Sequence, residues 1–252
     1  MACRATLLLS ASPSSLLFWV LGSALVYLLG SHMLWWLRTT PLGRLTVGRW
    51  PVEVGRFWFF LGVPYLAPGG WPLPPFHGLL SPEDLGLVGL NARWPVTRWL
   101  EAAGTGAGLG SLAALILVLA WTNARRGADP PPLRFPPRPW WALLVDGLCL
   151  EAHWAFYRAA LALLLGSVYW GVFLGLGLVY LEWGLNPWWR QGWRSNGAVG
   201  GQWLRAALAL VAALLFLLTH NLWVCLAIHW AVEQLFWPLG RERSRGSRCR
   251  AR

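Results

Sequence analysis

Between residues 140 and 239 the chain consists of long apolar segments, each interrupted by a few ionisable side chains at helical spacing. The clearest segment, LCLEAHWAFYRAALALLLG, contains Glu151, His153 and Arg158. A charged side chain at the centre of a bilayer costs about 2.5–3.5 kcal/mol even on insertion scales, so such groups usually face the interior of a helix bundle. This pattern predicts a polar site inside a membrane.

The overall composition also indicates a membrane protein. Of the 252 residues, 56% are hydrophobic and only 12% are charged, and the mean hydropathy is +0.47. Because about 20 apolar residues cross a bilayer core about 30 Å thick, we predict an all-α fold, a polytopic transmembrane bundle of about seven helices. The expected spans lie near 16–37, 104–121, 140–165, 167–185, 203–219 and 221–239, with 54–67 as a kinked span or a re-entrant segment.

Three regions follow from this pattern. Residues 1–139 are expected to hold the N-terminal spans, with an interfacial segment at 68–101 and a proline-rich loop at 127–139 that cannot be helical. Residues 140–239 form the core that carries the ionisable groups, and residues 240–252 form an arginine-rich tail.

The positive charge of the chain comes from arginine alone, with 21 basic and 10 acidic residues and no lysine. Most of the arginines fall in the expected loops and in the tail. Since cytoplasmic loops carry the basic excess in membrane proteins, we predict a multi-pass protein of the cytoplasmic membrane with a cytoplasmic C-terminus. The tail is better explained as the flank of the last helix than as a specific anionic-lipid site or a nucleic-acid site. Membrane lipids are expected partners and nucleic acid is not.

Glu151 and Arg158 are seven residues apart and therefore fall on nearly the same face of a helix. They form either an ion pair that holds helices together or part of a catalytic or binding site. His153 points away from Glu151 and shares a side with Tyr157. Glu182 lies near the end of its span, where it could reach water, so it ranks below Glu151.

His229 and Glu233 are four residues apart on the last apolar helix and are neighbours on one face. They could orient an imidazole or supply two metal ligands. His220 would face the other way on an unbroken helix, but Asn221 suggests a break. No cofactor is expected, although His153, His229 and Glu233 could together hold a divalent metal such as zinc, which activates a bound water.

Four sequence segments resemble those of the CPBP family of intramembrane proteases, which includes CAAX prenyl endopeptidases and bacteriocin-processing or immunity proteins. SPEDLGL at 81–87 resembles an interfacial segment of the family, and FYR at 156–158 resembles the end of its EExxxR motif. FLLTH at 216–220 matches its FxxxH pattern, and NLWVCLAIHWAVE at 221–233 is similar to its final HxxxN or HxxxD motif. The resemblance covers roughly residues 78 to 239.

The resemblance implies a glutamate-dependent intramembrane endopeptidase that cleaves membrane-embedded or lipidated peptides. Its implied catalytic residues are Glu151 as the base, Arg158 to fix the carboxylate, and His220, His229 and Glu233 around the water. The two motif glutamates correspond here to His153 and Trp154, with Glu151 two positions early, and Glu233 stands where Asn or Asp is usual.

Two other classes of function fit the same sequence. The departures from the motifs fit a catalytically degenerate relative, a non-catalytic subunit or scaffold that binds a partner in a membrane complex. The histidines also allow a pigment, quinone or haem binder with His32, His153 or His229 as axial ligands. The glycine-rich run GTGAGLG at 104–110 opens an expected membrane helix, and close helix packing explains it better than a nucleotide site.

Overall fold

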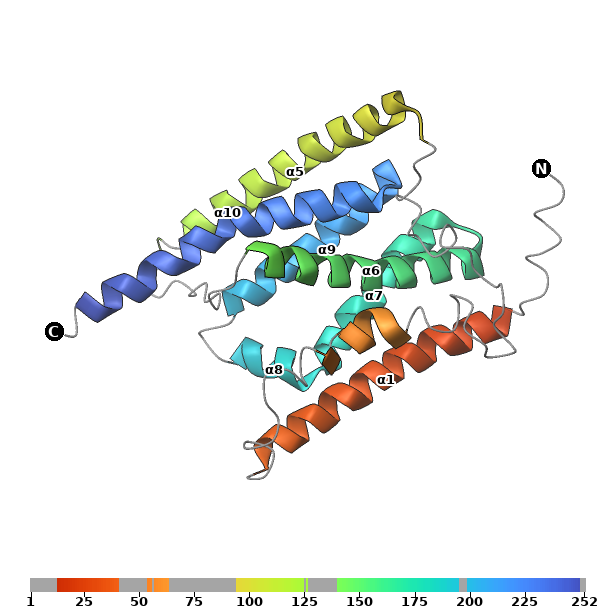
Figure 1. The fold of residues 1–252 in the computed structure, drawn as a ribbon, viewed down its shortest axis with the longest axis horizontal. Coiled ribbons are helices and arrows are strands. Elements are labelled where there is room, and N and C mark those ends of the chain that lie inside the picture. Colours follow the sequence, from red (N-terminus) through yellow and green to blue (C-terminus); the bar gives the residue numbers. More distant parts are fainter. Residues whose placement is uncertain are drawn as a thin grey trace. The chain divides into compact units, whose positions relative to one another are not determined.

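The structure of the chain is a computed structural model, and all the regular secondary structure that it describes is helical, which confirms the all-α prediction (Figure 1). It describes the backbone of residues 13–40, 54–55, 57–63, 94–124, 126, 140–194 and 199–249, and side chains between residues 16 and 236. The expected proline-rich loop at 127–139, the SPEDLGL segment and most of the expected interfacial segment at 68–101 lie outside these ranges.

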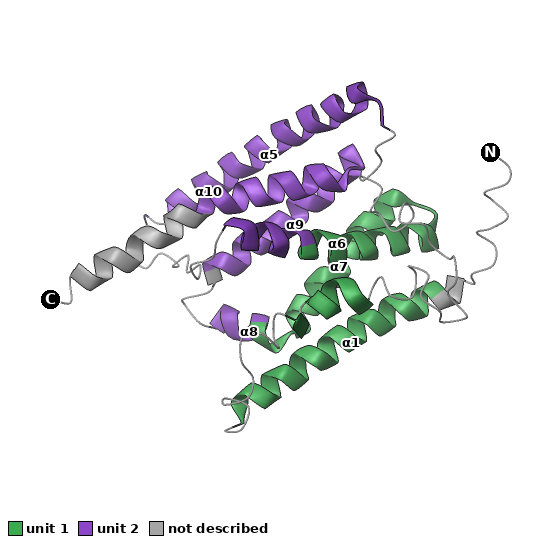
Figure 2. Ribbon diagram, viewed as in Figure 1, with its two compact units in different colours: residues 1–89, 149–188 green, residues 90–148, 189–252 purple. Residues whose placement is uncertain are grey.

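The chain divides into two compact units (Figure 2). Unit 1 consists of residues 1–89 and 149–188, and unit 2 of residues 90–148 and 189–252. The described elements of unit 1 are α1 (Pro13–Thr39), the short π-helix η2 (Trp58–Gly62), most of α6 (Trp140–Leu165) and α7 (Val168–Leu185). Those of unit 2 are α5 (Val96–Ala124), the first turns of α6, most of α8 (Pro187–Arg194), α9 (Val199–Thr219) and α10 (Leu222–Cys249).

Five of the described helices are long and apolar enough to cross a membrane, namely α1, α5, α6, α7 and α9. They coincide with five of the predicted spans. The span predicted at 221–239 corresponds to α10, whose apolar part, Leu222–Phe236, is shorter, and whose helical backbone continues into the arginine-rich tail as far as Cys249. Of the stretch at 54–67, the structure describes residues 54–55 and 57–63. The regular part, η2, has five residues and is less than about 8 Å long at the α-helical rise of 1.5 Å per residue, well short of a bilayer core.

Short connections with defined capping residues separate α6 from α7 and α7 from α8. After α6, Gly166 has a φ of +62°, a conformation that glycine adopts without strain and that commonly ends a helix. The Ser167 side chain then accepts a hydrogen bond from the Trp170 N–H at 3.4 Å and caps α7. Asn186 ends α7, and Pro187 follows at the first position of α8, where its missing N–H costs no helical bond.

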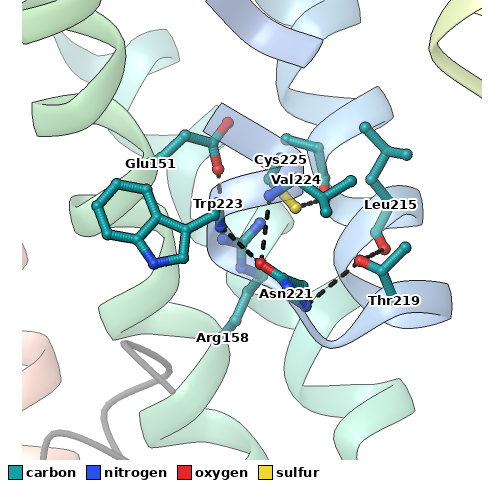
Figure 3. A network of polar contacts seen from close by, with 9 residues as sticks. Glu151, Arg158, Leu215, Thr219, Asn221, Trp223, Val224 and Cys225 are labelled. Carbon is teal, nitrogen blue, oxygen red and sulfur yellow. Dashed lines mark hydrogen bonds and ion pairs between the residues drawn. The ribbon is translucent and has the colours of Figure 1, made fainter. Parts of the chain in front are cut away.

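The connection between α9 and α10 contains the break that Asn221 predicts. His220 has a φ of +49°, and its N–H bonds the Phe216 carbonyl at 2.8 Å, which ends α9. The Asn221 Oδ1 atom accepts hydrogen bonds from the backbone N–H groups of Trp223 and Val224 at 2.9 and 3.2 Å and so caps α10 (Figure 3).

The core of unit 2 is apolar. Helices α5, α9 and α10 pack against one another. Gly106 and Gly110 of the glycine-rich run face Val224 and Ile228 of α10, which confirms close helix packing there. The buried centre consists of Leu204, Leu208, Val232 and Phe236.

Candidate functional site

Helix α6 contains ten consecutive buried residues, 151–160, although the segment includes four ionisable side chains. A helix buried on every side has no face left for solvent. The ionisable groups must therefore find their partners within the protein, since an unpaired buried charge is strongly unfavourable.

Glu151 and Arg158 form a buried ion pair in unit 1. Arg158 Nη2 lies 3.5 Å from Glu151 Oε2, and the two side chains are 3% and 0% exposed (Figure 3). This contact confirms the predicted shared face of the helix. Each charge compensates part of the cost of burying the other.

A second polar group, formed by His153, Tyr157 and Glu182, uses another face of α6. His153 Nε2 lies 3.0 Å from Glu182 Oε2, and the Tyr157 hydroxyl donates to Glu182 Oε1. His153 is two residues beyond Glu151, about 200° around the helix, so this group and the ion pair leave α6 in nearly opposite directions. Because His153 and Tyr157 lie one turn apart, a single carboxylate of α7 contacts two successive turns of α6.

The position of Glu182 corrects a prediction. We expected this side chain to reach water near the end of its span, but it is only 2% exposed. The next turn explains why, because Asn186, which ends α7, is itself buried and donates through Nδ2 to the Tyr27 hydroxyl of α1 at 2.8 Å. The end of α7 is thus held against protein, and Glu182 meets His153 and Tyr157 instead of solvent.

Aromatic rings surround the His153 imidazole. The centroids of Phe60 and Tyr27 lie 5.0 and 6.0 Å from the imidazole centroid, and that of Tyr157 lies 4.7 Å away. Of the two ring nitrogens, Nε2 is the one that contacts Glu182. The buried Nδ1 atom has no hydrogen-bond partner among the described residues.

Two glycines of α7 bring its backbone against the backbone of α6. A Cβ atom on Gly175 would lie 3.0 Å from the Arg158 nitrogen, and one on Gly171 would lie 2.5 Å from the Ala162 Cα. Such close approach requires residues without side chains. The backbone of Arg158 is therefore fixed at the point where its side chain reaches Glu151.

In unit 2, the predicted His229–Glu233 pair lies on one face of α10. His229 Nε2 is 3.7 Å from Glu233 Oε1, and His229 is 2% exposed. His220 is exposed and lies in the connection that ends α9, with its ring 6.1 Å from that of Phe216. The structure therefore gives His220 a place in a helix termination, and its predicted catalytic role stays a prediction.

The metal and haem alternatives involve His153, His229 and His32. In the described part of the chain, no group of three or more His, Cys, Asp or Glu side chains is arranged to hold a metal ion. His32 is exposed, with Nδ1 2.9 Å from the Leu28 carbonyl oxygen one turn earlier. This hydrogen bond of His32 is thus made within its own helix.

Comparison with protein-family models, with curated proteins and with solved structures finds no match to this chain. The resemblance to the CPBP family accordingly rests on the motifs quoted above.

The site residue that the sequence did not rank highly is Glu182. The signals that could have found it are the spacing of His153 and Tyr157, four residues apart on α6, and that of Gly171 and Gly175, four apart on α7. Together these spacings predict a close helix pair with two polar groups on the contact face.

Proposed function

We propose that this protein is an intramembrane endopeptidase of the CPBP type, in which Glu151 accepts the proton from the attacking water. The observation that carries the proposal is the Glu151–Arg158 pair, an ionised pair with exposures of 0% and 3% on a helix long and apolar enough to cross a membrane. Ionisable residues at membrane depth are costly and usually mark a functional site. The substrate class that follows from the resemblance is a membrane-embedded or lipidated peptide.

The chemistry is hydrolysis of a peptide bond by a general base. The Glu151 carboxylate takes one proton from water as the water oxygen bonds to the scissile carbonyl carbon. The C–N bond then breaks, and the same proton passes from Glu151 to the leaving amine, which regenerates the carboxylate. Arg158 is the positioning residue, because its guanidinium contacts one carboxylate oxygen of Glu151 and so holds the Glu151 side chain along one face of α6.

The test is cleavage of a fluorogenic library of transmembrane and prenylated peptides by the full-length protein in detergent. Glu151→Gln keeps the size of the side chain but removes the base, and we expect at least a hundredfold loss of turnover. The matched control is Glu101→Gln, an exposed glutamate of α5, which should cleave like the wild type. Full activity in Glu151→Gln would rule out this base.

His229→Ala tests the implied histidine separately. The resemblance assigns the histidine that orders the water to the helix that carries His229 and Glu233, so this variant should also lose turnover. If Glu151→Gln is inactive and His229→Ala is active, the His229–Glu233 pair is structural. Of the proposed catalytic groups, Glu151 as the base would then remain and His229 would not.

A non-catalytic subunit of a membrane complex is the second candidate, and a specific observation favours it. Glu182 of α7 contacts both His153 and Tyr157 of α6, as in a polar link between membrane helices, and Glu151 is already paired with Arg158 within α6. A folded wild type that cleaves no member of the library and co-purifies with a membrane partner would establish this function in place of proteolysis.

A further inference from the structure

Helix α8 lies between two candidate membrane spans. The span of α7 ends at Leu185, directly before α8 begins at Pro187, and the span in α9 starts at Gly200. Eight residues of helix are about 12 Å long, far short of a bilayer core. A helix of this length does not cross a membrane by itself, and we expect its tryptophans to hold it at the depth of the lipid headgroups.

One face of α8 is aromatic and packs against the start of α9. The Trp193 ring contacts the Trp203 ring edge to face, with centroids 4.9 Å apart. Gln202 Nε2 donates to the Trp189 carbonyl at 2.9 Å, and the buried Gly192 leaves room for the Gln202 side chain. Trp203 is nevertheless 60% exposed, as expected for an indole at the membrane–water interface.

The other face of α8 carries two arginines, Arg190 and Arg194, four residues apart. Both are exposed, and neither has an ion-pair partner among the residues that the structure describes. The nearest acidic residues in the sequence are Glu182, which is buried and engaged by His153 and Tyr157, and Glu233, far along α10. Within the described part of the chain, the short helix thus carries two cations without a charge partner, each directly after a tryptophan in the sequence.

We propose that the arginine face of α8 binds the phosphate groups of anionic phospholipids. A helix with a basic face and an aromatic face lies in the membrane interface. Its aromatic rings are then at the boundary between headgroups and acyl chains, and its cations are among the headgroups. The planar guanidinium matches a phosphate with two parallel N–H donors, which favours arginine at such a site. This binding is independent of whether the protein is a protease.

The experiment is native mass spectrometry of the full-length protein in an uncharged detergent, titrated with phosphatidylglycerol or phosphatidylcholine of the same acyl chains. We expect tighter binding of phosphatidylglycerol, and a loss of that preference by about fivefold for each arginine removed in R190Q/R194Q. The charge-matched control is R98Q/R126Q, which removes two exposed arginines elsewhere in unit 2 and should leave the preference within about twofold.

Two further measurements keep the result interpretable. R190K/R194K keeps both charges but lacks the planar pair of N–H donors, so its preference should lie between those of the wild type and R190Q/R194Q. The wild-type preference for phosphatidylglycerol should also fall as the salt concentration rises from about 0.01 to 0.15 M, because the Debye length becomes shorter over that range. If R190Q/R194Q and R98Q/R126Q lose the preference for phosphatidylglycerol equally, the proposal is overturned, since net charge alone would then explain the binding. An unchanged preference in R190Q/R194Q would do the same.

Discussion

Units 1 and 2 both bury helices of membrane-spanning length, but they do so with different chemistry. In unit 2, the contacts among α5, α9 and α10 are made by apolar side chains such as Leu208 and Phe236. In unit 1, the buried part of α6 contacts α7 through Glu182, His153 and Tyr157 and through glycine backbone. Within a membrane, apolar contacts gain little over contacts with lipid. The polar contacts therefore define the partners of α6 more narrowly than apolar packing could.

The largest effect is expected from Glu182→Ala in unit 1. This substitution leaves the buried His153 and Tyr157 without their shared acceptor, and we expect the free energy of unfolding to fall by about 2–4 kcal/mol, because each buried donor left unsatisfied costs about 1–3 kcal/mol. Glu101→Ala, on an exposed face of α5 in unit 2, should leave stability unchanged. Unfolding by SDS titration in mixed micelles measures both. A loss below about 1 kcal/mol in Glu182→Ala would show that Glu182 does not stabilise the pair of helices.

The second-largest effect on the free energy of unfolding is expected at the backbone contact between α6 and α7. An added methyl at Gly171 would meet backbone atoms of Ala162 at 2.5 Å, and backbone cannot move aside as a side chain can. Gly171→Ala should therefore destabilise by about 1–3 kcal/mol. Gly177→Ala is the control on the same helix, because nothing lies within 4 Å of its added methyl, and it should gain up to about 1 kcal/mol from helix propensity. The same titration applies, and equal effects of the two substitutions would contradict the contact.

A smaller effect is expected at the corresponding contact of unit 2. A methyl added to Gly110 would meet side-chain atoms of Ile228, the nearest at 2.7 Å. Because Ile228 is only partly buried and can change its rotamer, Gly110→Ala should destabilise by about 1 kcal/mol. Gly108→Ala, which meets nothing within 4 Å, is the control. If Gly110→Ala costs as much as Gly171→Ala, the distinction between side-chain and backbone contacts fails.

The sequence predicts contacts within one helix better than contacts between helices. The spacing of Glu151 and Arg158, and of His229 and Glu233, places each pair on one face, and the structure shows both contacts. Helix periodicity is sufficient for such pairs. The partner of His153, by contrast, is 29 residues away on α7, and a single sequence does not say which faces of two helices meet.

The boundaries of the helices show the same limit. The span predicted at 140–165 has the bounds of α6, and Asn221 marks the observed break before α10, because apolar runs and capping residues are local signals. The predicted span at 104–121 is too short, since α5 begins at Val96. Its first turns contain Arg98 and Glu101, whose exposure shows that a helix can begin before its apolar face does.

The smallest effect distinguishes a structural from a catalytic role for His220. Its φ of +49° is a conformation that glycine adopts more readily, so His220→Gly should stabilise the connection between α9 and α10 by about 0.5–1 kcal/mol. Thermal unfolding in detergent measures this gain, and peptide cleavage is measured on the same sample. Retained turnover in the stabilised variant would place His220 with the capping residue Asn221 as part of a helix break. Lost turnover without lost stability would instead place His220 among the groups that act on the peptide, because a residue needed only for the turn would be replaced by glycine without harm.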